Sequence, residues 1–264
     1  MRLKLTIEYA GTRYSGWQIQ KNARTVQGEL QRAIQEATGS SSFELYGSGR
    51  TDAGVHALAQ VAHLDFDDSR AGRSLESLRW KVNDTLPSDI NLLRIEKVPH
   101  RFHARHSAIA RSYIYQIARR RTAFAKNFVW WVKDPLDVES MRKLALQFVG
   151  MHDFRSFSDE DPDEKSTQVL VDSLDVHEDG DLILMHIEGS HFIWKMVRRL
   201  VGVLVEVGRG ALSEADAVAM LTQSSALPAT LTAPAAGLFL ERVYYEGDPR
   251  DLPVQSAVVL PPWR

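Results

Sequence analysis

The chain carries the same order of predicted elements twice, and this repetition limits the folds open to it. In the first half, apolar and polar residues alternate over 3–9, which is typical of a half-buried strand. Thr25 and Gly39 suit the two ends of a helix over 26–37. The other predicted strands are 43–47, 58–66, 90–98, 107–118, 169–176, 181–189 and 237–245, and the other predicted helices are 74–83, 137–149, 194–207 and one capped by Ser213.

The repeated order of strand, helix, strand and strand predicts an α+β protein. We expect two similar α/β half-domains with antiparallel or mixed sheets, flanking a central basic cleft. The N-terminal half is expected at 1–105, the C-terminal half at 106–246, and an irregular tail at 247–264. A chain of 264 residues is long enough for two small domains.

Composition narrows the chemistry. The chain has no cysteine, which excludes disulfides, thiolate nucleophiles and thiolate metal sites. Its nine histidines lack zinc-like spacing, so we expect no metal. No apolar run is long enough to cross a bilayer, and the early alternation of polar residues is unlike a signal peptide. The expected location is the cytoplasm, with no membrane partner.

The net charge of the chain does not decide whether it binds nucleic acid. A formal charge of −2 argues against a nucleic-acid binder, because phosphate contacts need Lys and Arg. The basic residues are clustered, however, at 101–106, 119–121 and 195–199, and acidic residues gather at 159–164. A nearly neutral chain with such clusters can still present one strongly positive face.

The motif with the clearest chemical content is the loop Gly49-Arg50-Thr51-Asp52-Ala53-Gly54-Val55-His56. Its glycines permit tight turns and close approach by a ligand, and a tight turn lets Arg50 and Asp52 face one cavity. Two other interpretations stay open from the residues alone. Asp in such a loop is commonly a turn former. A phosphate-binding loop is the other interpretation, and the absence of the Walker pattern weakens it.

Two further segments contain candidate functional residues. Tyr113 lies on the predicted strand 107–118, where an aromatic residue is more often part of the core but can also stack on an extruded base. Arg198 lies in the apolar helix 194–207, where it either extends to solvent or, if buried, needs a carboxylate partner such as Asp52.

The loop and several other segments, in this order, resemble the tRNA pseudouridine synthase A (TruA) family. The resemblance covers roughly residues 3–246. Its segments are Tyr9 to Gln20 with Gly11, Tyr14 and Gly16-Trp17-Gln18, then Gly49 to His56, Phe102 to Arg105, Tyr113, His152 to Phe157, Met196 to Arg198 and Ala233 to Leu238. Three features depart from the family: Ala10, His106 and the acidic stretch 159–164.

The resemblance implies a fold, a reaction and a site. It implies the pseudouridine synthase fold and isomerisation of uridine to pseudouridine, without a cofactor. The substrate would be the anticodon arm of tRNA, at uridines 38 to 40, bound by a homodimer. Asp52 would be the nucleophile, attacking either ribose C1′ or uracil C6. Tyr113 would stack on the base and help remove a proton, and Arg198 would pair with Asp52. Further substrate contacts would come from Arg50, Arg105 and Leu238.

Two rival functions differ from this one in what they require. An RNA-binding protein that has lost catalysis would not need Asp52, Tyr113 and Arg198 together. A carboxylate glycosidase or nucleosidase would also use an aspartate at an anomeric carbon, but a retaining enzyme needs a second carboxylate nearby. No second carboxylate accompanies Asp52 in its loop. Base release from a free nucleoside would favour the glycosidase or nucleosidase.

Overall fold

The computed structural model describes residues 1–66, 74–159 and 165–260, and the chain divides into two compact units. Unit 1 contains Met1–Ile109 and Leu240–Arg250. Unit 2 contains Ala110–Phe239 and the chain from Asp251 onwards. A late segment of the chain therefore belongs to unit 1, although the residues before and after it belong to unit 2.

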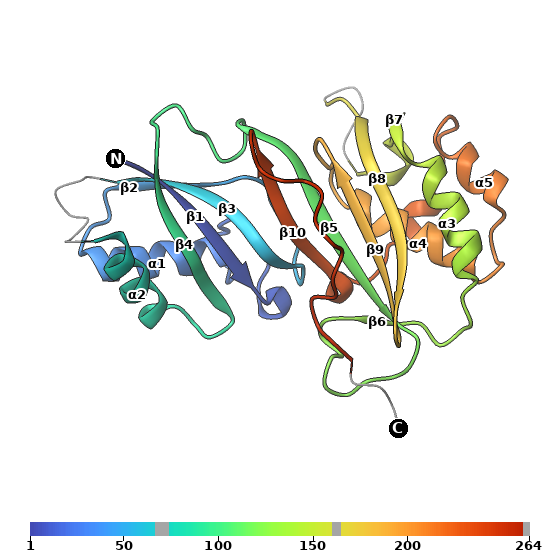
Figure 1. The fold of residues 1–264 in the computed structure, drawn as a ribbon, viewed down its shortest axis with the longest axis horizontal. Helices are drawn as coiled ribbons and strands as arrows, with labels where there is room; N and C mark the ends of the chain where they lie inside the picture. Colours follow the sequence, from blue (N-terminus) through green and yellow to red (C-terminus); the bar gives the residue numbers. More distant parts are fainter. Residues whose placement is uncertain (67–73, 160–164, 261–264) are drawn as a thin grey trace. The chain divides into compact units, whose positions relative to one another are not determined.

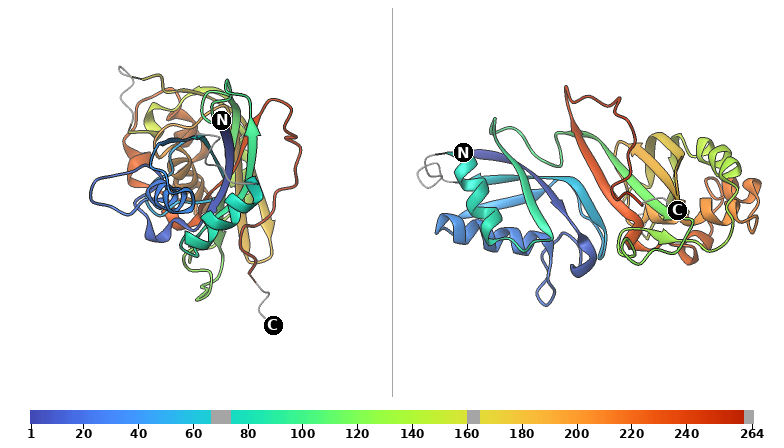
Figure 2. Two further views of the ribbon diagram at one scale, coloured as in Figure 1. Left: turned by 90° about the vertical axis from the view of Figure 1, so that its left-hand side faces the viewer. Right: turned by 60° about the horizontal axis from the view of Figure 1, so that its bottom comes forward.

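A sheet with the strand order β4, β1, β3 and β10 forms the centre of unit 1, and β2 pairs with β3. The pairs of β1 with β3 and β4, and of β2 with β3, are antiparallel. Helices α1 and α2 pack against each other and lie on one face of this sheet (Figures 1 and 2). The elements are β1 (Arg2–Tyr9), the 3-10 helix η1 (Gly11–Arg13), α1 (Val26–Thr38), β2 (Phe43–Gly47), β3 (His56–Phe66), α2 (Leu75–Thr85), β4 (Ile90–Val98) and most of β10 (Leu238–Tyr245).

Local sequence explains where the elements of unit 1 begin and end. Every second residue of β1 is buried, as its alternating pattern requires. The Thr25 hydroxyl accepts the amide N–H of Gly28 at 3.3 Å, and Gly39 ends α1 with φ +66°. Helix α2 stops at Thr85 because the next residue, Leu86, precedes a proline and is extended.

Unit 2 has an antiparallel sheet in the order β5, β9, β8 and β7, and β6 pairs in parallel with β5. Helix α3 packs on both β8 and α4 (Figure 1). The elements are β5 (Ala108–Ala118, from Ala110 in unit 2), β6 (Trp130–Trp131), α3 (Val138–Gln147), β7 (Gly150–Asp153), the 3-10 helix η3 (Arg155–Phe157), β8 (Gln168–Asp179), β9 (Leu182–Gly189), α4 (Met196–Gly208), α5 (Glu214–Ala219), α6 (Leu227–Thr230) and the 3-10 helix η4 (Ala235–Gly237).

The predicted α+β class is confirmed, and all the predicted strands and helices are present. Several boundaries differ by one to three residues, and two of these differences have clear local reasons. Strand β8 continues to Asp179, directly before a turn at Gly180 with φ +58°. Helix α4 begins at Met196 and not at 194, because Lys195 has a left-handed backbone with φ +63°. Elements of two to four residues, such as β6, β7 and α6, were not predicted, because they are too short to show a periodic pattern.

Candidate active site

Asp52 opens a tight turn between β2 and β3. The amide of Val55 donates to the Asp52 carbonyl at 3.1 Å, and Gly54 occupies the third position of this turn with φ +80°. A hydrogen-bonded turn with a positive φ at that position is of type II, which favours glycine. Asp52 itself is half-buried. The loop therefore has one defined backbone path, and the interpretation of Asp52 as a turn residue is compatible with a functional one.

The segment between β1 and α1 holds this turn in place. The amide of Trp17 donates to the Thr51 carbonyl at 3.1 Å, and the Tyr9 hydroxyl lies 2.8 Å from the Thr51 hydroxyl in a buried hydrogen bond. A Cβ at Gly11 would stand 1.9 Å from the Val55 carbonyl oxygen, and a Cβ at Gly16 would stand 2.5 Å from that of Thr51. The two glycines thus allow backbone to lie against backbone on either side of Asp52.

Those supporting residues were not predicted as part of the site. The sequence did contain a signal for them, because Gly11, Gly16 and Trp17 belong to the opening segment of the family resemblance. Their contribution is indirect, since they fix the backbone on either side of Asp52, and none of these bonds involves its side chain.

Arg50 is exposed two residues before Asp52. Within the part of the chain that the structure describes, its guanidinium has no hydrogen bond or ion pair. At Gly49, a Cβ would meet no atom within 4 Å, and its φ is not positive. The fold of unit 1 therefore does not require glycine at 49, and the open space beside Arg50 is suited to an incoming ligand.

Arg105 lies in a second loop of unit 1, which is shaped by histidine rings. The amides of Arg105 and His106 donate to Nδ1 of His103 at 3.1 and 3.3 Å, and the amide of Ala104 donates to Nδ1 of buried His63 at 3.1 Å. The departure from the family at His106 places its ring 4.3 Å from that of His103. Arg105 is exposed at the tip of this loop.

Tyr113 lies on β5 in unit 2, opposite Ile187 of β9, and is half-buried. The ring of Phe192 packs edge-on against it, with centroids 5.2 Å apart and planes at 86°. Its neighbour Tyr115 is different, because burial raises the pKa of that phenol far above its usual range and its hydroxyl donates to the Pro234 carbonyl at 2.8 Å. Of these two tyrosines on one strand, only Tyr113 has a partly accessible ring.

Arg198 lies in the first turn of α4 and is half-buried. Its Nε donates to the Ala233 carbonyl at 2.7 Å, and the amide of Ala233 donates back to the Arg198 carbonyl at 3.0 Å. Leu238, the first residue of β10, is only 5% exposed. Tyr113, Arg198 and Leu238 thus all belong to unit 2, whereas Arg50 and Asp52 belong to unit 1.

The basic clusters predicted from the sequence are partly neutralised. Arg119 pairs with Glu178 and Arg120 with Asp181. Lys195 and Arg199 both pair with Asp159, the first residue of the acidic stretch. The rest of that stretch, 160–164, lies outside the described residues.

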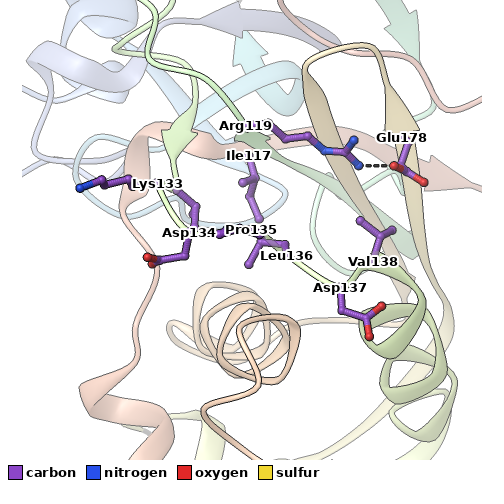
Figure 3. Close-up of a pocket in the computed structure, with 10 residues that line it drawn as sticks. Ile117, Arg119, Lys133, Asp134, Pro135, Leu136, Asp137, Val138 and Glu178 are labelled. Atoms are coloured by element: carbon purple, nitrogen blue, oxygen red, sulfur yellow. Dashed lines mark hydrogen bonds and ion pairs between the residues drawn. The ribbon is translucent and has the colours of Figure 1, made fainter.

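A cavity of about 500 Å³ in unit 2 contains none of the predicted site residues (Figure 3). It is lined by Ile117, Arg119, Glu178 and the segment from Val132 to Val138. The ion pair between Arg119 and Glu178 crosses one side of it. Charges of both signs in the wall do not indicate a particular ligand.

Comparison with known proteins decides the family. The family model described as tRNA pseudouridine synthase matches residues 5–107 and again residues 144–246. The chain belongs to this family. The first matched segment of the pseudouridine synthase contains Asp52, the second contains Arg198 and Leu238, and Tyr113 lies between them.

Its similarity to curated synthases extends over nearly the whole chain. The tRNA pseudouridine synthase A of Rhodopseudomonas palustris is 42% identical over 248 residues, which are 93% of this chain and 99% of the relative. The tRNA pseudouridine synthase A of Methylococcus capsulatus is 39% identical over 93% of this chain and 90% of its own length. The tRNA pseudouridine synthase A 2 of Clostridium tetani is 37% identical over 92% and 98%, respectively. The resemblance seen in the sequence is confirmed.

The part of this synthase that the structure describes contains neither a membrane-spanning helix nor a cluster of metal ligands. No helix there combines the length and apolar character needed to cross a membrane. No group of three or more His, Asp or Glu side chains in the same residues is arranged to hold a metal ion.

Proposed function

We propose that this protein isomerises uridine to pseudouridine in the anticodon arm of tRNA, at uridines 38 to 40, with Asp52 as its nucleophile. The observation that carries the proposal is the loop of unit 1. It presents a half-buried carboxylate on a turn fixed by the bonds from Val55 and Trp17, next to the exposed guanidinium of Arg50. A positioned carboxylate can act as a nucleophile, and a free guanidinium suits an RNA phosphate.

Pseudouridine is an isomer of uridine, so the reaction only rearranges bonds within the substrate. The bond between ribose C1′ and the uracil nitrogen N1 breaks, the base rotates, and a new bond forms from C1′ to C5. C5 then loses its proton, and N1 gains one, by way of solvent or a side chain. Asp52 attacks either C1′ or C6. In the first case the carboxylate leaves C1′ as C5 bonds to it, and in the second it is eliminated from C6 as C5 loses its proton. Because atoms and electrons balance within the substrate, the step requires no oxidant or second substrate.

Three residues of unit 2 complete the proposed site. The ring of Tyr113, held edge-on by Phe192, stacks on the uracil, and its hydroxyl assists removal of the C5 proton. An unperturbed phenol has a pKa of about 10, so this second role needs help from the site. A guanidinium and a carboxylate are complementary charges, and the proposal assigns Arg198 as the partner of Asp52. Leu238 adds a further substrate contact.

The tRNA is bound mainly through exposed arginines. Extruding a base from its stem costs a few kcal/mol, and phosphate contacts offset that cost. Arg50 and Arg105 are both exposed and are assigned to this role. The protein acts as a homodimer in this proposal, so that a nearly neutral subunit contributes to a longer basic groove.

The decisive experiment is Asp52→Asn. Unmodified tRNA is incubated with the variant, and pseudouridine is mapped at every uridine. We expect product formation to be abolished while tRNA binding persists, because the amide keeps the shape and loses the nucleophile. Asp84→Asn, an exposed aspartate on α2, is the matched control and should react like the wild type. Substantial turnover by Asp52→Asn would remove the assignment.

A second variant tests the charge partner. Arg198→Met should lower activity, because Asp52 then loses the charged partner that the proposal assigns to it. Arg198→Lys, which keeps a positive charge, should retain more activity than Arg198→Met. Wild-type turnover by Arg198→Met at neutral pH would refute the ion pair.

A further inference from the structure

The connection between β9 and α4 touches both residues of unit 2 that we assign to the reaction. This connection, Ser190 to Lys195, carries Phe192, whose ring packs against Tyr113. It also leads directly into the first turn of α4, which carries Arg198. A change in the path of these six residues would therefore move a contact of Tyr113 and the backbone of Arg198 together.

The connection ends in a strained residue. Among the described residues, Lys195 is the only one other than glycine with a positive φ, at +63°. Such a backbone persists in a side-chain-bearing residue only where its surroundings hold it. The Lys195 carbonyl accepts the amide of Arg199 at 3.1 Å, which is the first hydrogen bond of the helix. The start of α4 thus depends on Lys195 keeping this conformation.

Asp159 supplies the surroundings that hold it. One carboxylate oxygen accepts a hydrogen bond from Nζ of Lys195 at 2.7 Å, and the other pairs with the guanidinium of Arg199. The Arg199 side chain is only 4% exposed, and among the described residues its Nε has no hydrogen-bond partner. A buried guanidinium needs a compensating charge, so Arg199 keeps Asp159 in place. Asp159 in turn holds the side chain of Lys195, whose backbone is strained.

The charge on Asp159 is secure at neutral pH. The hydrogen bond from Lys195, followed by the one from Arg199, lowers the pKa of this carboxyl below its usual value, against the opposing effect of burial. These two cations are the charged groups that face it from α4 and from the connection. The carboxylate therefore stays ionised throughout the range in which an enzyme of this family would be assayed.

We propose that Asp159 is a positioning residue for the isomerisation, which fixes the connection Ser190 to Lys195 and thereby sets Arg198 and the ring of Tyr113. This proposal rests on the proposed function, because it takes the roles of those two residues from there. Asp159 acts through Lys195 and Arg199.

The test is Asp159→Asn in the full chain, with unmodified tRNA as the substrate. We expect kcat to fall about tenfold to a hundredfold, which is the range for a small misplacement of a reacting group, and KM to stay within about twofold. Asp159→Glu keeps the carboxylate and should recover most of the loss. Glu206→Gln is the matched control, because Glu206 pairs with Arg209 at the other end of α4, and it should leave kcat unchanged.

Two combined variants separate positioning from stability. Asp159→Asn with Arg199→Met removes the unpaired buried charge, so thermal stability should return while kcat stays low. Adding Lys195→Gly should then raise kcat, because glycine adopts a positive φ without strain. Full recovery of kcat in the first combination would overturn the proposal, as would wild-type kcat in Asp159→Asn or a change confined to KM.

Hydrogen exchange tests the clamp independently of the reaction. The amide of residue 199 should exchange faster in Asp159→Asn than in the wild type, because its acceptor is the Lys195 carbonyl. Unchanged exchange would overturn the clamp even where activity falls. If the wild type formed no pseudouridine in tRNA, the proposed function would fail by that result alone, and the exchange experiment would still decide whether Asp159 holds α4.

Discussion

His63 makes the stability of unit 1 depend on pH, and the structure gives the size of the effect. Burial, followed by the positive charges of Arg2 and His103, lowers the pKa of His63 from 6.5 to about 4, and Asp65 opposes this only in part. The neutral ring is useful to the fold, because its Nδ1 accepts the amide of Ala104 at 3.1 Å. A proton on Nδ1 would remove that acceptor and place a charge beside Arg2.

The sign of the effect follows from the direction of the shift. Because the pKa is lower in the folded state, unfolded chains take up a proton first as the pH falls. The stabilisation is fully present above pH 6.5 and is lost progressively toward pH 4. With pKa values of 6.5 and about 4 in the unfolded and folded states, the free energy of unfolding is about 2 kcal/mol lower at pH 5 than at pH 7.5.

The assay is urea unfolding at these two pH values, followed by the indole signal of Trp17, which is buried in unit 1. His63→Gln keeps an acceptor for Ala104 but cannot titrate, so its stability should fall by about 2 kcal/mol less than that of the wild type. His177→Gln, at an exposed position of β8, is the control and should behave like the wild type. Equal losses in His63→Gln and the wild type would refute the reasoning.

Three further predictions concern glycines. Gly49→Ala should leave unit 1 as stable as before but lower turnover of tRNA if substrate enters the open space there, and unchanged turnover would show that it does not. Gly16→Ala should destabilise unit 1 by at least about 1 kcal/mol in urea unfolding, because its φ of +89° is strained for alanine and the Cβ meets the Thr51 carbonyl. Gly202→Ala should lower the melting temperature of unit 2, since its Cβ would stand 1.7 Å from the Leu231 carbonyl oxygen, and an unchanged melting temperature would contradict that contact.

Much of the local structure could be predicted because its causes are local. The alternation in β1, the cap at Thr25 and the stop at Gly39 each depend on residues within one or two turns of chain, and all three are present in the structure. The catalytic roles rested on a resemblance carried by ordered segments, and the family they indicated is confirmed.

Other features were outside the reach of such patterns. The left-handed conformation of Lys195 shortens the predicted helix, and the Lys195 side chain bonds an aspartate 36 residues earlier in the chain. The basic cluster at 195–199 looked available for RNA in the sequence, whereas Lys195 and Arg199 are occupied by that same aspartate. No spacing rule predicts which distant carboxylate reaches a given cation.

The sequence by itself determined the α+β class, most element boundaries and the identity of the candidate nucleophile, because periodicity, caps and an ordered set of motifs are written along the chain. Only the tertiary structure decided what holds that nucleophile in place. The turn at Asp52 is fixed by a separate segment, through the Tyr9 hydroxyl, the Trp17 amide and the backbone of Gly11, where no room is left for a Cβ. Such contacts depend on where two segments come together in space, and a pattern within one segment cannot specify that.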